Sequence, residues 1–170
     1  MGVIEWFMQL PDVTKAAAIT ATILFLLYLR IRLSKHGRIK RSIRKSKLIY
    51  YQDFEANWRN SDGSGYKYND RSGCYVITLY NHRITARVAY MHYENIYIGQ
   101  SQNVCQRVHN HFQGKSNKGD VYADIKYGME AYVRIIPCKE KRLNELEKEL
   151  IEAFGATESY NRTRGGAKGR

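Results

Sequence analysis

The stretch from Asn95 to Phe112, NIYIGQSQNVCQRVHNHF, decides which fold to expect. Its first five residues, NIYIG, are β-branched and aromatic and end at a glycine, which is typical of a strand. A helix can begin just after them, because Ser101 or Asn103 can cap its first turn. Apolar residues then recur at helical spacing on one face, namely Val104, Val108 and Phe112. The sequence therefore predicts a strand that leads directly into an amphipathic helix.

Further strands and helices are expected on both sides of this unit. Residues 73–81, GCYVITLYN, are rich in strand-forming residues, and residues 131–138, AYVRIIPC, form a similar run that a proline stops. Residues 120–128, DVYADIKYG, are typical of a helix that ends at a glycine, and residues 139–156, KEKRLNELEKELIEAFGA, are strongly amphipathic. We expect an α+β domain with a central three-stranded antiparallel sheet flanked by helices.

The N-terminal part of the chain has a different character. Residues 16–29, AAAITATILFLLYL, carry no charge. The apolar stretch reaches the length of a membrane span, residues 13–33, if Lys15, Arg30 and Arg32 extend their long stems toward the lipid headgroups. Acidic residues and the lack of a cleavage site argue against a signal peptide. The pattern favours a transmembrane helix, with a core helix of a soluble domain as the alternative.

A strongly basic segment follows the apolar stretch. Between Arg30 and Lys47 there are nine Lys and Arg residues and no acidic residue. Basic flanks stay on the cytoplasmic side, so we expect a single-pass membrane protein with a cytoplasmic C-terminal domain. The same cations can bind anionic lipid or DNA phosphates without sequence preference. The net charge of +12 agrees with either polyanion and does not choose between them.

Composition divides the chain into four segments: residues 1–33 with the transmembrane helix, a basic juxtamembrane segment and linker at 34–72, a globular domain at 73–161, and a flexible basic tail at 162–170. The linker assignment depends on residues 61–73, SDGSGYKYNDRSG, which favour turns. Just upstream, Phe54 and Trp58 are expected in a short amphipathic helix. The three cysteines are far apart and lack metal-site spacing, so we expect reduced thiols at Cys74, Cys105 and Cys138.

Candidate catalytic residues first stand out on the predicted helix after NIYIG. Arg107 and His111 are four residues apart, so both side chains can point at one phosphate, the arginine as a charged clamp and the histidine in proton transfer. Taken alone, such a pair is also compatible with a solvated surface. In the helix at 139–156 the acidic residues are mostly on the solvent side, and periodicity does not single out Glu147.

These residues resemble the motifs of the GIY-YIG nuclease family in order and spacing. Gly73-Cys74-Tyr75 stands where the family has GIY, and Tyr97-Ile98-Gly99 where it has YIG. The likeness continues through further positions: Arg107 and His111, the Lys126–Gly128 turn, Glu147 with Ile151, and the Tyr160-Asn161 pair. The resemblance covers residues 73–161. Two departures are Cys74 in place of isoleucine and a longer connection between the first two strands, NHRITARVAYMHYEN.

The resemblance implies an endonuclease that hydrolyses DNA phosphodiester bonds with a divalent metal. It assigns Glu147 as the metal ligand. A hard oxygen site of this kind suits Mg²⁺, with Mn²⁺ as the alternative. Asn161, near the end of the domain, would either orient this glutamate or anchor the end of a strand.

The remaining implied roles concern proton transfer and charge. Tyr75 would deprotonate or orient the attacking water, while Tyr97 and His111 would shape the proton network, and which of them is the base stays open. Arg107 would stabilise the negative charge of the transition state.

Three basic residues outside these motifs are candidate DNA contacts: Lys115, Arg83 and Arg87. The two arginines lie in the long connection, where ordinary surface charge is the simpler interpretation because no base-reading motif is present. Expected partners are DNA and membrane lipid, and no protein partner is indicated. Two other functions stay open: a catalytically inactive DNA tether at the membrane, and a lipid-surface interaction protein.

Overall fold

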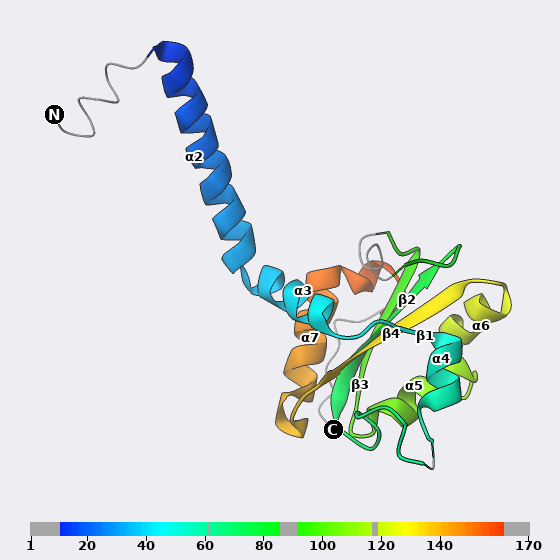
Figure 1. Ribbon diagram of the computed structural model, residues 1–170. Helices are drawn as coiled ribbons and strands as arrows, with labels where there is room; N and C mark the ends of the chain where they lie inside the picture. The colour runs from blue at the N-terminus through cyan, green and yellow to red at the C-terminus, as the bar shows by residue number, and fades with distance from the viewer. Residues whose placement is uncertain (1–10, 61, 86–91, 117–118, 162–170) are drawn as a thin grey trace. The chain divides into compact units, whose positions relative to one another are not determined.

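The computed structural model of the protein describes residues 11–60, 62–85, 92–116 and 119–161. The chain divides into two compact units between Arg38 and Ile39. The first unit contains the predicted membrane segment, and the second contains the sheet and its helices (Figure 1).

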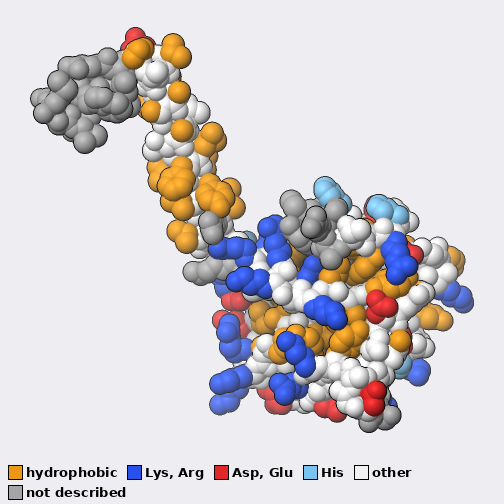
Figure 2. All heavy atoms as spheres, in the orientation of Figure 1, with side chains coloured by type: hydrophobic (Ala, Val, Ile, Leu, Met, Phe, Trp, Pro, Cys, Tyr) orange, Lys and Arg blue, Asp and Glu red, His pale blue; other side chains and the backbone are white. Residues whose placement is uncertain are grey.

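The first unit consists mainly of one apolar helix, α2 (Asp12–Leu33). Figure 2 shows hydrophobic side chains along its surface. By length and composition its Asp12–Ile31 part can cross a membrane, with a mean hydropathy of 1.5 and none of it buried. The hydroxyls of Thr20 and Thr22 donate to backbone carbonyls one turn earlier, at 2.9 and 2.8 Å, so these polar groups are satisfied inside the helix. The predicted span at residues 13–33 is therefore a continuous helix.

A four-stranded antiparallel sheet forms the centre of the second unit. The spatial order is β1 (Ile49–Tyr50), β4 (Glu130–Pro137), β2 (Gly73–Tyr80) and β3 (Asn95–Ser101). The three long strands are those predicted from the sequence. The predicted strand count of three was wrong, because β1 adds a fourth strand through the pairs Ile49–Val133 and Tyr50–Tyr132. Two residues are too few to show an alternating pattern, so this strand depends on its pairing with β4.

Helices cover both faces of the sheet (Figure 1). One face packs against α4 (Tyr51–Asn57), α5 (Val104–Phe112) and α6 (Asp120–Lys126). The other packs against α3 (Lys35–Lys45) and α7 (Leu143–Phe154), and single 3₁₀ turns, η1 (Glu140–Arg142) and η2 (Ala156–Glu158), flank α7.

The central strand β2 is buried along its whole length, and its side chains alternate between the two layers. Tyr75 and Ile77 belong to the core on the α5 side. Cys74 and Val76 belong to the core on the α7 side. Residues on opposite faces of this strand therefore meet different helices.

The segment upstream of β2 contributes to the core of the second unit. Ile39 and Ile43 of α3 are buried beside α7, and the amphipathic helix expected around Phe54 is present as α4. The buried Arg134 donates to the carbonyl oxygens of Ile43, at 3.3 Å, and of Ser46. A guanidinium at this position satisfies carbonyl groups that a helix end leaves without intrahelical partners.

The cysteines are free, as expected. Burial raises the pKa of Cys105 to about 11 and raises that of Cys74 as well. These two thiols are therefore protonated packing groups at neutral pH.

Candidate active site

The pairing of β2 with β3 brings the two tyrosine motifs together. Tyr75 lies opposite Gly99 in the antiparallel ladder. A β-carbon at Gly99 would lie 2.6 Å from Cζ of Tyr75, so only a glycine lets the phenol ring lie across this strand. Gly73 has a similar constraint, because its β-carbon would lie 2.8 Å from the carbonyl oxygen of Ile136 on β4. The glycines of both motifs thus permit close approach to a neighbouring strand or side chain.

Tyr75 and His111 form a buried hydrogen-bonded pair. The distance between Tyr75 Oη and His111 Nε2 is 2.8 Å, and each residue is 1% exposed. The ring of Tyr97 lies near both, with centroids 4.6 Å from the imidazole and 6.1 Å from the Tyr75 ring. Two phenols and one imidazole are therefore in mutual contact beneath the surface of the domain.

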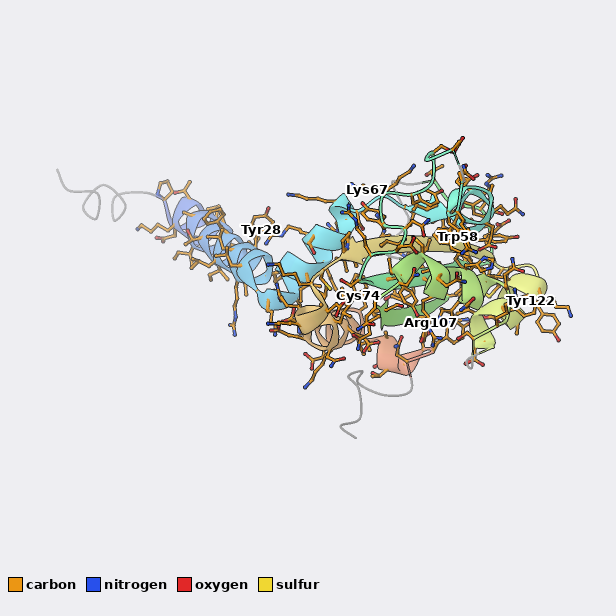
Figure 3. The ribbon with its side chains drawn as sticks, turned by 90° about the horizontal axis from the view of Figure 1, so that it is seen from below. Tyr28, Trp58, Lys67, Cys74, Arg107 and Tyr122 are labelled. Atoms are coloured by element: carbon orange, nitrogen blue, oxygen red, sulfur yellow. The ribbon has the colours of Figure 1, made fainter. Side chains whose placement is uncertain are left out.

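Arg107 supplies positive charge to this cluster from one turn earlier on α5 (Figure 3). Burial raises the pKa of Tyr75 well above its usual value, and the Tyr97 phenol raises it further, whereas Arg107 lowers it. The pKa of Tyr97 is also raised by burial and lowered by Arg107. Burial outweighs the arginine, so both phenols keep their protons at neutral pH.

Glu147 reaches the same cluster from the other layer. It is half-buried on α7, and its Oε2 accepts a hydrogen bond of 3.0 Å from Nε2 of Gln100, the residue that follows Gly99. The same amide nitrogen donates to Oδ1 of Asn144, one turn before Glu147. The charge of Glu147 raises the pKa of Tyr97. Gln100 therefore connects the carboxylate to the end of β3.

The position of β3 at the edge of the sheet explains how the two layers meet. Tyr75 and His111 lie on the α5 side, and Glu147 lies on α7, which covers the opposite face. Side chains from opposite faces can approach one another only around an edge strand, and β3 is that strand. In Figure 3, Cys74 lies nearer to α7, while Trp58 and Tyr122 lie on the α4–α6 side.

Asn161 fixes the exposed edge of β3. Its side-chain Oδ1 accepts from the Ile98 amide at 2.7 Å, and its Nδ2 donates to the Ile98 carbonyl at 2.6 Å. Ser159 Oγ accepts from the Ile96 amide at 2.9 Å, and the Tyr160 amide donates to the Ile96 carbonyl at 3.3 Å. These bonds hold the backbone on both sides of Tyr97. Of the two roles expected for Asn161, these hydrogen bonds correspond to anchoring the strand.

Comparison with known protein families agrees with this arrangement. A family model of the GIY-YIG catalytic domain matches residues 71–161, more than half of the chain. The chain belongs to the GIY-YIG family. This family points to nuclease chemistry, the hydrolysis of phosphodiester bonds, with DNA as the substrate. No curated protein and no solved structure matched the chain.

The donor set of this GIY-YIG domain fits a hard metal ion held by one protein carboxylate. Within the described residues there is no group of three or more His, Cys, Asp or Glu side chains that could hold a metal. The Glu147 carboxylate lies beside the neutral amides of Gln100 and Asn144 and is the group that could hold such an ion. Mg²⁺ tolerates such a site because it keeps several waters and completes its shell with phosphate oxygens.

Of the other candidate residues, Lys115 and Arg83 lie in the described part of the chain. Lys115 is exposed just after α5, and its backbone amide donates to the Asn110 carbonyl at 2.8 Å. The Arg83 guanidinium lies 4.7 Å from the ring centroid of Tyr50, at the opposite edge of the sheet from β3. Arg87 lies outside the described residues. The Lys126–Gly128 turn ends α6, where Gly128 has a φ of +98°.

Two polar residues of the site were missed by the sequence analysis, Gln100 and Asn144. Gln100 follows the second tyrosine motif directly, and Asn144 lies three residues before Glu147. A signal existed in these positions, since Asn144 and Glu147 are neighbours on a helix surface. Their bond to Gln100 comes from the packing of α7 against β3, which spacing alone does not reveal.

A test of the close packing at Gly99 is its replacement by alanine. The Tyr75 ring must move away from β3, which breaks the 2.8 Å contact with His111. We expect Gly99→Ala to lower the cleavage rate at least about 100-fold, comparable to the loss of a group that stabilises transition-state charge. Gly119→Ala is the matched control, because nothing lies within 4 Å of its added carbon. Equal rates for the two variants would contradict the packing argument.

Stability at alkaline pH tests the protonation of Tyr75. Because its folded-state pKa lies above the unfolded value near 10, the unfolded chain loses the phenol proton first as pH rises. Each such group lowers the free energy of unfolding by up to about 1.4 kcal/mol per pH unit above that point. Tyr75→Phe should therefore lose less stability than the wild type as pH rises above about 10.

Urea unfolding at several pH values measures this difference. Tyr127→Phe is the control, because the Tyr127 side chain is 87% exposed and should leave the wild-type slope unchanged. If Tyr75→Phe and the wild type lose stability in parallel, Tyr75 does not carry a buried proton.

Proposed function

We propose that the protein is a membrane-anchored, metal-dependent endonuclease that hydrolyses DNA phosphodiester bonds. The observation that carries the proposal is the buried hydrogen bond between Tyr75 and His111, next to Arg107 and within reach of the Glu147 carboxylate. A protein that only held DNA would need surface cations and no buried proton-transfer pair.

Tyr75 and His111 would act together on the attacking water. In the tautomer that carries the ring proton on Nδ1, Nε2 of His111 would accept from the Tyr75 hydroxyl, which burial keeps protonated. The water proton passes to Oη of Tyr75 as the phenol proton passes to Nε2 of His111. The water oxygen forms its bond to phosphorus while the bond to the leaving oxygen breaks. This relay explains why a phenol with a raised pKa can take part in base catalysis at neutral pH.

Arg107 would stabilise negative charge directly, and Glu147 would do so through a bound metal ion. The Arg107 guanidinium lies close enough to affect both phenols, so it would stabilise charge on the phosphoryl oxygens beside them. Glu147 would hold the metal, with Gln100 fixing the carboxylate and Mg²⁺ as the preferred ion over Mn²⁺. When bound, the metal supplies Lewis-acid stabilisation of the phosphate.

The membrane assignment is supported by α2 and by the charges that follow it. α2 is 22 residues long, and its apolar side chains are exposed, whereas those of a soluble core helix would be covered by protein. The exposed cations of α3 continue the basic flank, with Lys35, Lys40 and Arg44 among them. We propose a single-pass protein whose nuclease domain faces the cytoplasm and acts on DNA entering or leaving the cell.

Cleavage of supercoiled plasmid by the full-length protein in detergent, with Mg²⁺, tests the catalytic assignment. Glu147→Gln keeps the hydrogen-bonding shape and removes the charge, so we expect cleavage to fall at least about 100-fold. Glu152→Gln is the matched control, because this exposed glutamate lies on the same helix. If Glu147→Gln cuts at the wild-type rate, the metal assignment fails. If the wild type binds plasmid without cutting it, the DNA tether becomes the better account.

The membrane assignment has its own measurement. A lysine at the centre of a transmembrane helix costs roughly 2.5–3.5 kcal/mol for insertion, so replacing both Leu24 and Leu27 by lysine should move the protein out of the carbonate-resistant membrane fraction. Replacing both by alanine is the control and should leave the protein in the membrane. A wild-type protein that carbonate extracts would contradict a spanning helix.

A further inference from the structure

We propose that the sheet end beside Glu147 contains a nucleotide subsite that selects one base next to the cleaved phosphate. The inference rests on the proposed nuclease function and adds a specificity site to it. Its first element is a hollow of about 380 Å³ lined by polar side chains and one apolar residue: Gln100, Ser101, Gln102, Glu140, Leu143 and Asn144.

The hollow is connected to Glu147 through two of its lining residues, Gln100 and Asn144. Gln100 forms part of its wall and donates to Glu147 at 3.0 Å, and Asn144 accepts from the same amide. Ser101 lies opposite Gly73 in the ladder, two residues before Tyr75. A group bound in the hollow would therefore be adjacent to the phosphate on which Tyr75 and Glu147 act.

The chemistry of the lining suits a nucleobase better than a phosphate. Gln100, Gln102 and Asn144 present amides, which pair with the donor and acceptor edge of a base, and Glu140 presents a carboxylate, which accepts from an exocyclic amine. The residues that line this hollow include no Lys or Arg, and Glu140 would repel a phosphate. Leu143, which is buried, is the apolar residue of the lining.

Gln102 and Glu140, at the rim of the hollow, can replace the hydrogen bond between them with hydrogen bonds to a base. The bond from Gln102 Nε2 to Glu140 Oε2 is long, at 3.4 Å, and both residues are exposed. Such a bond contributes little in water, so a base edge can replace it at small cost. Because the site is concave rather than a projecting helix, it fits one base turned out of the stack.

A second hollow lies next to the first and contains the positively charged side chains that the first lacks. It has a volume of about 380 Å³ and is lined by Arg71, Ser72, Pro137, Cys138 and Lys139. Lys139 and Glu140 are consecutive residues that line one hollow each, so the two sites are neighbours. Both lie at the end of the sheet where Gly73 pairs with Ser101 on one side and Pro137 on the other.

The two hollows together match the succession of backbone phosphate and base along a nucleic acid strand. Arg71 and Lys139 are exposed cations that suit a backbone phosphate, and the amide hollow suits the base attached to it. Phosphate contacts position a strand without reading it, and base contacts specify the sequence. The subsite therefore combines affinity from one hollow with base preference from the other.

The base preference is tested by sequencing the ends produced from a pool of random-sequence duplexes cut by the full-length protein with Mg²⁺. We expect one position next to the cut to favour one base on the order of 10-fold, as a well-placed amide pair provides. Gln102→Ala and Asn144→Ala should abolish the base preference at this position. Gln52→Ala, which changes an exposed amide on α4, should keep the preference.

The cationic hollow predicts a different response. Arg71→Ala and Lys139→Ala should raise KM equally for all sequences and reduce the salt slope of binding by about 1 each, with the base preference unchanged. Lys67→Ala, an exposed lysine that lines neither hollow, should leave the salt slope as in the wild type.

A binding measurement separates this inference from the nuclease assignment. The fluorescence of 2-aminopurine in bound DNA should rise when Glu147→Gln binds it, because the base leaves the stack. The double variant with Asn144→Ala should show no such rise in fluorescence. If the wild type cuts with no base preference and 2-aminopurine stays quenched, the subsite is wrong and the nuclease function stands. If the wild type does not cut but 2-aminopurine brightens in an Asn144-dependent way, the subsite stands and the nuclease function is wrong.

Discussion

The register of β2 against β3 is the constraint on which the rest of the site depends. With Tyr75 opposite Gly99, the phenol lies over a position without a side chain and reaches His111 on α5. A shift of one residue would turn Tyr75 toward the α7 core and place Cys74 beneath α5. The burial of β2 on both faces resists such a shift, since every side chain of the strand would exchange one core for the other.

The edge position of β3 then determines where the proposed catalytic residues can meet. Polar groups from two helical layers must meet without crossing a closely packed sheet, and they do so at the last residues of an edge strand. Gln100 continues β3 and bonds to Glu147 on α7, so it joins the end of this strand to the α7 layer. Both surface hollows lie at this end of the sheet, so the proposed nucleotide subsite and the proposed catalytic residues share one end of the sheet.

Much of this architecture could be predicted from the sequence, because the long strands and amphipathic helices have clear periodicity. The strand β1 could not, since two residues carry no pattern and its partner is about 80 residues away in the chain. The basic composition of α3 also gave no indication of its packing, in which Ile39 and Ile43 are buried. In each case a few tertiary contacts outweighed local composition.

The candidate site was predictable to a different extent. Periodicity placed Arg107 and His111 on one helix face, but only resemblance to a family selected Glu147 among several glutamates. No spacing rule could join Gln100 to Glu147, because that bond depends on how α7 crosses β3.

The hydrogen bonds of residues 159–161 also affect how this protein behaves among other protein molecules. An uncovered edge strand offers free amide and carbonyl groups on which another chain can add a strand and begin aggregation. The Asn161 side chain occupies both groups of Ile98, and Ser159 Oγ occupies the amide of Ile96, whose carbonyl accepts from the Tyr160 backbone amide. The residue that anchors β3 therefore also leaves fewer of its backbone groups available for pairing with another chain.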